Sequence, residues 1–129
     1  MNHNKPSHPH SIKNVELIVG EIKERGNLHA ALLAFKDGGI ISEVGGDDRD
    51  SNQFSAMCAS VLKSAEGLGQ TFGEGNVGRI ITELEDQSII IVKCSEKTYL
   101  VLFFKHDTEV DFITKNLDGY IQKIITALQ

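Results

Sequence analysis

The sequence predicts an α/β fold of the α+β kind: a single domain with the element order αββαβββα and a five-stranded, mostly antiparallel sheet. Three observations support this prediction. Apolar residues recur at three- and four-residue steps in three long segments, which is the period of a helix. Apolar runs of strand length fill the segments between them. Most links between these runs are so short that the strands they join must be antiparallel neighbours.

The first helix is expected after a polar start. Residues 1–10 contain two prolines and three histidines and no sizeable apolar side chain after Met1, so we expect a flexible tail there. Its histidines could bind a metal only after the tail became ordered. From Ser11 to Arg25 apolar residues line one helical face, and Gly26 is a stop signal. The domain is therefore expected to span residues 11–129.

A β-hairpin is expected next. Residues 28–35 form a nearly continuous apolar run, residues 36–39 have turn composition, and residues 40–44 form a shorter and more polar run. The acidic loop that follows lacks the alternating oxygen ligands of a calcium loop. Its last residue, Asp50, or the adjacent Ser51 can accept the free amide hydrogens that open a helix.

The second helix is expected over about residues 51–72, with two distinct faces. We expect an apolar stripe to pack on the sheet; its members are Phe54, Met57, Cys58, Val61, Leu62, Ala65, Leu68 and Phe72. The opposite face carries mostly small side chains, which would let a second helix approach closely; it contains Ala56, Ser60, Lys63, Ser64 and Gly67.

Three strands and a last helix complete the chain. The strands are expected over residues 77–85, 88–94 and 98–104, and the helix begins near Asp107 or Thr108. Continuous apolar runs indicate central strands, whereas short or alternating runs indicate edges. The hairpin and the three-stranded meander then give the sheet order 2-1-5-4-3, with the second helix on one face and the first and last helices on the other.

The exposed third strand and the small-residue helix face predict pairing with a second copy. Edge-to-edge pairing about a two-fold axis would join two sheets into one. The expected interface consists of Ala56, Ala59, Ser60, Lys63, Ser64, Gly67, Val77, Arg79 and Ile81. For Arg79 two interpretations stay open: it crosses the seam or meets an acidic partner, or it is a solvent-facing charge that discourages aggregation.

Charge and composition exclude several function classes. The chain has 13 basic and 18 acidic side chains and a formal charge of -5, so no basic field favours nucleic acid. No apolar stretch approaches the roughly 20 residues of a membrane span, and the start lacks the order of a signal peptide. A cytoplasmic location is expected. Cys58 and Cys94 lie in apolar segments and are expected to be reduced core residues.

No catalytic, cofactor-binding or metal-binding residues are expected. Residues 73–78 match GxGxxG, but a helix precedes them and a strand follows, the reverse of a dinucleotide-binding turn. We expect a connector whose glycines adopt positive φ. His29 and His106 begin and end strands, where rim positions are more typical than general bases. Paired acids such as Glu83 and Glu85 have no apolar enclosure to shift their pKa values.

From about Ser11 to Leu128 the sequence resembles the Roadblock/LC7 family of small dimeric regulators. The resemblance is carried by the hairpin at residues 27–41, the helix opening at 54–59, and the paired runs 88–92 and 99–102. In the family an apolar strand is commonly followed by Asp-Gly. Here residues 30–33 and the pair Asp37-Gly38 stand at those positions.

The resemblance implies a homodimer, or a heterodimer with a paralogue, joined through the second helix and the third strand. Family members bind Ras-like small GTPases as activating proteins or scaffolds, or serve as dynein light chains. The bacterial activators of this type supply no arginine finger, so no catalytic residue is carried over. Three functions therefore compete: a GTPase regulator or scaffold, a structural dimer that recruits other proteins without kinetic effect, and a small-molecule sensor.

Overall fold

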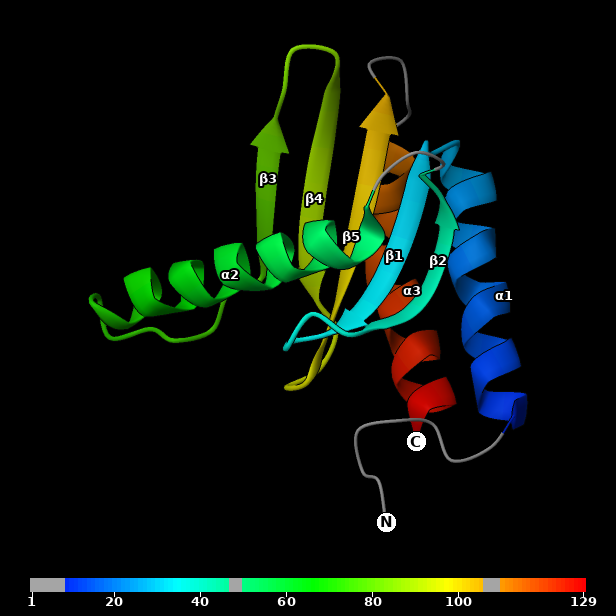
Figure 1. Cartoon of the computed structure of the whole chain (residues 1–129), viewed down its shortest axis with the longest axis horizontal. Coiled ribbons are helices and arrows are strands. Elements are labelled where there is room, and N and C mark those ends of the chain that lie inside the picture. Colours follow the sequence, from blue (N-terminus) through cyan, green and yellow to red (C-terminus); the bar gives the residue numbers. More distant parts are fainter. Residues whose placement is uncertain (1–8, 47–49, 106–109) are drawn as a thin grey trace.

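The computed structural model describes residues 9–46, 50–105 and 110–129 and confirms the predicted element order (Figure 1). The expected tail residues 1–8, His106 and the expected cap Thr108 lie outside this description. The elements are α1 (Pro9–Gly26), β1 (Ala30–Phe35), β2 (Ile40–Gly45), α2 (Ser51–Gln70), β3 (Arg79–Glu83), β4 (Gln87–Lys93), β5 (Thr98–Lys105) and α3 (Val110–Leu128).

Helix boundaries differ from the predicted ones by small amounts. α1 begins at Pro9, two residues before the predicted start, because a proline is tolerated in the first helical turn, where its missing N–H has no partner to lose. α2 begins as predicted, with the Asp50 carboxylate accepting a hydrogen bond from the Gln53 amide at 3.1 Å. It ends at Gln70 rather than near Phe72, and the Thr71 N–H bonds back to the Leu68 carbonyl.

The sheet has the predicted order, β2-β1-β5-β4-β3, and every neighbouring pair is antiparallel. β2 and β3 are therefore the edges. The pairing of β1 with β5 joins strands that are far apart in the chain, with Ala30 opposite Phe103 and Phe35 opposite Thr98. Both central strands are almost wholly buried, as their continuous apolar runs predict.

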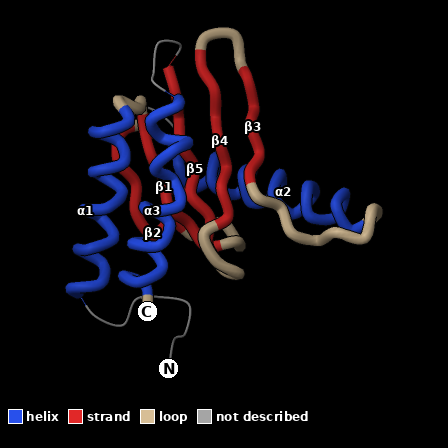
Figure 2. Tube along the Cα trace, turned by 180° about the vertical axis from the view of Figure 1, so that it is seen from behind, coloured by secondary structure: helices blue, strands red, loops and turns tan. Residues whose placement is uncertain are grey.

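Helices cover both faces of the sheet, as predicted. α2 crosses one face at a steep angle to the strands, and α1 and α3 lie side by side on the other face (Figures 1 and 2). Alternate residues of the strands divide between two cores. The core under α1 and α3 includes Leu33, Leu100 and Leu102, whereas the core under α2 includes Leu32, Val101 and Phe103.

One buried polar contact fixes where α2 crosses the sheet. The Tyr99 hydroxyl of β5 donates to the Ser55 carbonyl of α2 at 2.8 Å and lies 3.0 Å from the Ser55 hydroxyl. Both residues are fully buried. Beside them the rings of Phe54 and Phe103 pack with centroids 4.9 Å apart. A buried hydroxyl without a partner is costly, so this pair favours one position of α2 over a sliding one.

The β1–β2 turn also holds α2 in place. Gly38 adopts φ +99°, and a Cβ added there would lie 3.2 Å from the Ala56 Cα of α2. Only glycine combines this backbone conformation with so close an approach. The Asp37-Gly38 pair therefore serves both the hairpin turn and the contact between the hairpin and α2.

The expected apolar stripe of α2 is only partly correct. Within it, Cys58 and Leu62 are buried against the sheet, together with Ser55, which the pattern did not assign to that face. Four stripe residues are instead exposed by 44–81% of their surface: Met57, Val61, Leu68 and Phe72. For Val61 and Leu68 the reason is geometric, because the second half of α2 projects beyond β3, where the described chain has no strand beneath it (Figure 1).

A double-mutant cycle tests the Tyr99–Ser55 contact. Tyr99→Phe should lower the free energy of unfolding by about 1–2 kcal/mol, because a buried hydrogen bond is lost without a change in shape. Ser55→Ala should cost less, since the backbone acceptor remains. Urea unfolding of both single variants and of the double variant should show a double loss smaller than the sum. A strictly additive loss would show that the two hydroxyl groups are not coupled.

Candidate functional site

α2 exposes an apolar side that no part of the described chain covers. Met57, Val61 and Leu68 are 60%, 44% and 66% exposed. They follow one another at four- and seven-residue steps, so they lie on one side of the helix. We call these three residues the apolar flank. Exposed apolar groups gathered in this way are typical of an interaction surface.

The other side of α2 is built mainly of small residues and borders a groove. Five predicted interface residues, Ala56, Ala59, Ser60, Lys63 and Gly67, line this groove of about 710 Å³ together with Lys36, Asp37, Glu66 and Gln70. We call those five the small-residue flank. Because Lys36 and Asp37 belong to the β1–β2 turn, this flank faces that turn. By helical geometry the apolar flank lies on the other side of α2 from this turn.

An ion-pair cluster anchors α2 at the groove. Glu66 lies 2.9 Å from the Lys36 Nζ and 3.8 Å from the Lys93 Nζ, and its side chain is only 14% exposed. Lys93 also approaches Glu96 at 3.5 Å. A half-enclosed carboxylate between two ammonium groups is held more firmly than a single surface pair. The cluster joins the projecting part of α2 to both the β1–β2 turn and β4.

β3 forms an open edge next to this helix. Strand residues alternate between faces, and Ile80 packs with the core under α2. Arg79 and Ile81 therefore point to the opposite face, the face of α1 and α3, where Ile81 is 55% exposed. Within the described part of the chain the backbone of β3 pairs only with β4, so its outer hydrogen-bonding groups are available to another strand.

The nine predicted interface residues thus fall into separate places. Seven are exposed, whereas Ala59 and Val77 are half-buried and pack against the core under α2. Ser64 lies on the outer surface of α2 between its two flanks. The apolar flank could not be told from the core stripe in the sequence, because both have the same helical periodicity. The signal that could have revealed the apolar flank was the predicted length of α2, which exceeds the width of the predicted sheet.

The buried thiols are not activated for chemistry. Burial raises the pKa of Cys58 to about 11 and that of Cys94 to about 12. Both are free and buried, as predicted. At neutral pH they stay protonated, and a protonated thiol is a poor nucleophile and metal ligand. Burial also raises the pKa of the Tyr99 phenol, which the Ser55 hydrogen bond lowers in part.

The remaining motif residues lie apart from one another. The connector 73–78 runs from α2 to β3, and only Gly73 of its glycines has positive φ, so the expectation of positive φ at the others is wrong. His29 is half-buried just before β1. Within the described ranges no three His, Cys, Asp or Glu side chains gather as metal ligands. No described helix is long and apolar enough to cross a membrane.

Comparisons with known proteins place these surfaces in context. A family model described as the Roadblock/LC7 domain matches residues 14–104. No curated protein matches the sequence. The structure resembles the gliding protein MglB of Thermus thermophilus, with a TM-score of 0.88 and 11% identity over 99% of this chain and 98% of that one.

Two further solved structures are similar. MglB of Myxococcus xanthus has a TM-score of 0.82 and 17% identity, covering 87% of this chain and 92% of that one. A Roadblock/LC7 domain from Streptomyces avermitilis has a TM-score of 0.80 and 16% identity, covering 88% and 96%. At such identities these likenesses establish a shared fold.

Proposed function

The chain belongs to the Roadblock/LC7 domain family, and on this premise we propose that it is a dimeric regulator or scaffold of a Ras-like small GTPase, acting in the cytoplasm without catalytic groups of its own. The observation that carries the proposal is the apolar flank of α2 beside the open edge of β3. Both features need a partner, and a second copy supplies one for each at the same time.

The length of α2 supports a dimer joined at β3. The second half of the helix projects beyond that strand (Figure 1) and carries the exposed Leu68. If two copies pair through β3, the partner's sheet continues beyond the edge and lies beneath the projecting half. The dimer therefore covers apolar surface that a monomer leaves in water.

Charge on β3 supports one register of this pairing. When two β3 strands run antiparallel with Ile81 opposite its own copy, Arg79 of each strand lies opposite Glu83 of the other. Opposite charges at such cross-strand positions are stabilising. The two Ile81 side chains meet on the face away from α2, where each is 55% exposed in the single chain. If Arg79 were only a solvent-facing charge, its complementarity to Glu83 of the other copy would have no role.

The small-residue flank is not used in this dimer and can bind a further partner. In this dimer the apolar flanks face each other, so the groove beside the β1–β2 turn stays open. Its small side chains Ala56, Ser60 and Gly67 let a partner backbone approach closely, and Lys63 offers an exposed cation. We assign this groove to the GTPase. Regulation then requires that the dimer bind one nucleotide state of the GTPase more tightly than the other.

Substitutions at two adjacent residues of α2 test which of its two flanks forms the dimer interface. Val61→Glu should weaken dimerisation by about tenfold or more, because it places a charge in the covered apolar flank. Ser60→Glu makes the same change one residue away and should leave the dimer intact. Light scattering after gel filtration measures both masses. If Ser60→Glu separates the copies and Val61→Glu does not, the seam lies on the small-residue flank.

A charge exchange tests the register of β3. Arg79→Glu and Glu83→Arg should each weaken the dimer by up to about tenfold, because each variant sets like charges opposite one another twice in the dimer. The double variant should recover the wild-type association measured by sedimentation. A double variant as weak as the single ones would exclude the register centred on Ile81.

Nucleotide-dependent capture tests the GTPase proposal. The purified domain should retain a small GTPase from source-cell lysate in the presence of a GTP analogue or of GDP, but not equally in both. Lys63→Glu should reduce that retention, and Val61→Glu serves to ask whether the dimer is needed. The captured GTPase should then hydrolyse GTP at an altered rate in single-turnover assays. Capture of other proteins regardless of nucleotide would favour the scaffold that recruits non-GTPase partners.

A further inference from the structure

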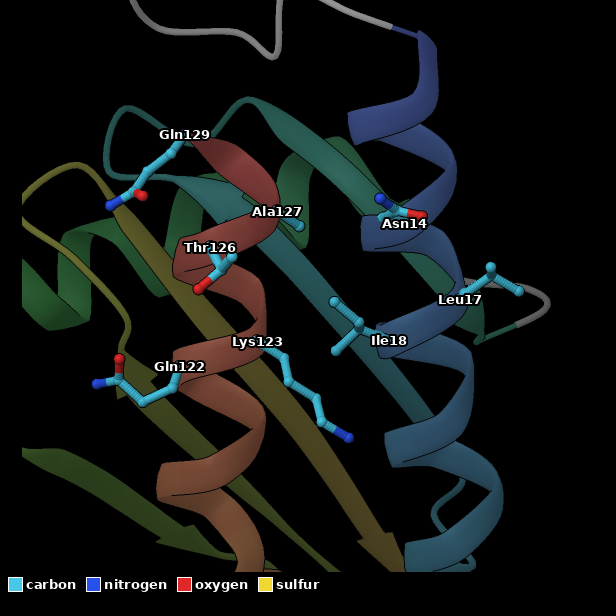
Figure 3. A pocket seen from close by; sticks show the side chains of 8 residues that line it. All are labelled: Asn14, Leu17, Ile18, Gln122, Lys123, Thr126, Ala127 and Gln129. Carbon is cyan, nitrogen blue, oxygen red and sulfur yellow. The ribbon is translucent and has the colours of Figure 1, made fainter.

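A second apolar surface lies on the face of the molecule opposite α2. A groove of about 610 Å³ runs between α1 and α3 and is lined by Leu17, Ile18, Lys123, Thr126 and Ala127, among others. Ile18 and Lys123 point into the space between the two helices, whereas Leu17 points outward from α1 (Figure 3). Ile18 and Ala127 pack against the core and form the apolar floor.

Leu17 has no role in the core of its own chain. The core positions of α1 are Val15, Val19 and Ile22, each fully buried. Leu17 lies on the opposite side of the helix and is 71% exposed. A leucine so placed contributes nothing to the fold beyond helix propensity. Leu17 is therefore the residue of this face that would gain most from being buried by a partner.

The charges around Leu17 are arranged as a homodimer contact requires. Lys13 precedes Leu17 by four residues and Glu21 follows it by four. If two α1 helices cross antiparallel at Leu17, each Lys13 comes level with Glu21 of the other copy. A two-fold contact must be complementary to itself, and this pattern is. Glu21 already lies 3.6 Å from Lys123 of its own chain, so its carboxylate would bridge two ammonium groups.

Gly20 agrees with the same arrangement. It lies inside α1, where glycine costs about 1 kcal/mol relative to alanine. A Cβ added at Gly20 would meet nothing within 4 Å in the described residues, so packing among them does not require glycine. In the antiparallel crossing Gly20 comes level with Asn14 of the other copy. The missing side chain would let the two helices come close there.

We propose that this face is a second self-association surface, at which the α1 helices of two copies pack antiparallel with Leu17 against Leu17. The occupant is a second copy of this chain, because the same face of α1 supplies the central leucine and both members of the charge pair. The surface lies on the other face of the sheet from α2, so it is independent of the proposed β3 dimer. Both contacts together would join four copies.

Sedimentation velocity over a wide range of protein concentration tests the proposal, in the wild-type chain and in Val61→Glu. The wild type should show an association step beyond the β3 dimer, and Val61→Glu should show a monomer–dimer step alone. Leu17→Glu should weaken that step by about tenfold or more in both backgrounds. Since Leu17 is exposed, the variant should unfold at the same urea concentration as its parent.

Charge reversal supplies the matched control. Lys13→Glu and Glu21→Lys should each weaken the step, and the two together should recover much of it. Glu16→Lys makes the same charge change one residue from Leu17 but about 100° away around the helix, and should have little effect. A single mass throughout the concentration range, an unchanged Leu17→Glu variant, or a double variant no better than the single ones would each overturn the proposal. None of these outcomes depends on whether a GTPase binds.

Discussion

α2 runs across the strands, and its 20 residues span about 30 Å at about 1.5 Å per residue. The five strands beneath are separated by four gaps of about 4.8 Å, which makes the sheet only about 19 Å wide. Since the buried Tyr99–Ser55 contact places the beginning of α2 over a central strand, the excess length must emerge beyond β3. The exposure of Val61 and Leu68 in the second half of α2 follows from this difference in length.

The fold could be predicted from the sequence to a large extent because local patterns agreed with one another. Residues 28–35 and 98–104 are continuously apolar, which is what a strand buried on both faces requires. The short links after β1 and β4 allowed only hairpins. Together these constraints leave one simple strand order, and the structure has it. Family resemblance then agreed with a topology obtained on independent grounds.

The candidate site could not be predicted to the same extent. Helical periodicity states which residues of α2 share a side, but not whether a sheet lies beneath that side. Val61 and Leu62 are neighbours in an apolar segment, yet Leu62 is buried and Val61 is 44% exposed. Only the position of β3 relative to the helix decides this. Likewise, the alternation of β3 did not reveal that Ile81 faces away from α2, because the face depends on pairing with β4.

The position of β5 between β1 and β4 has a consequence for folding during translation. β1 and β2 leave the ribosome early, but β1 obtains its second neighbour only when residues about 70 positions later have been made. Until then this apolar strand has one unpaired edge. Loop closure over such a distance is slow compared with hairpin formation. The nascent chain therefore carries this apolar edge unpaired through about half of translation, and early chaperone contact should fall on that segment.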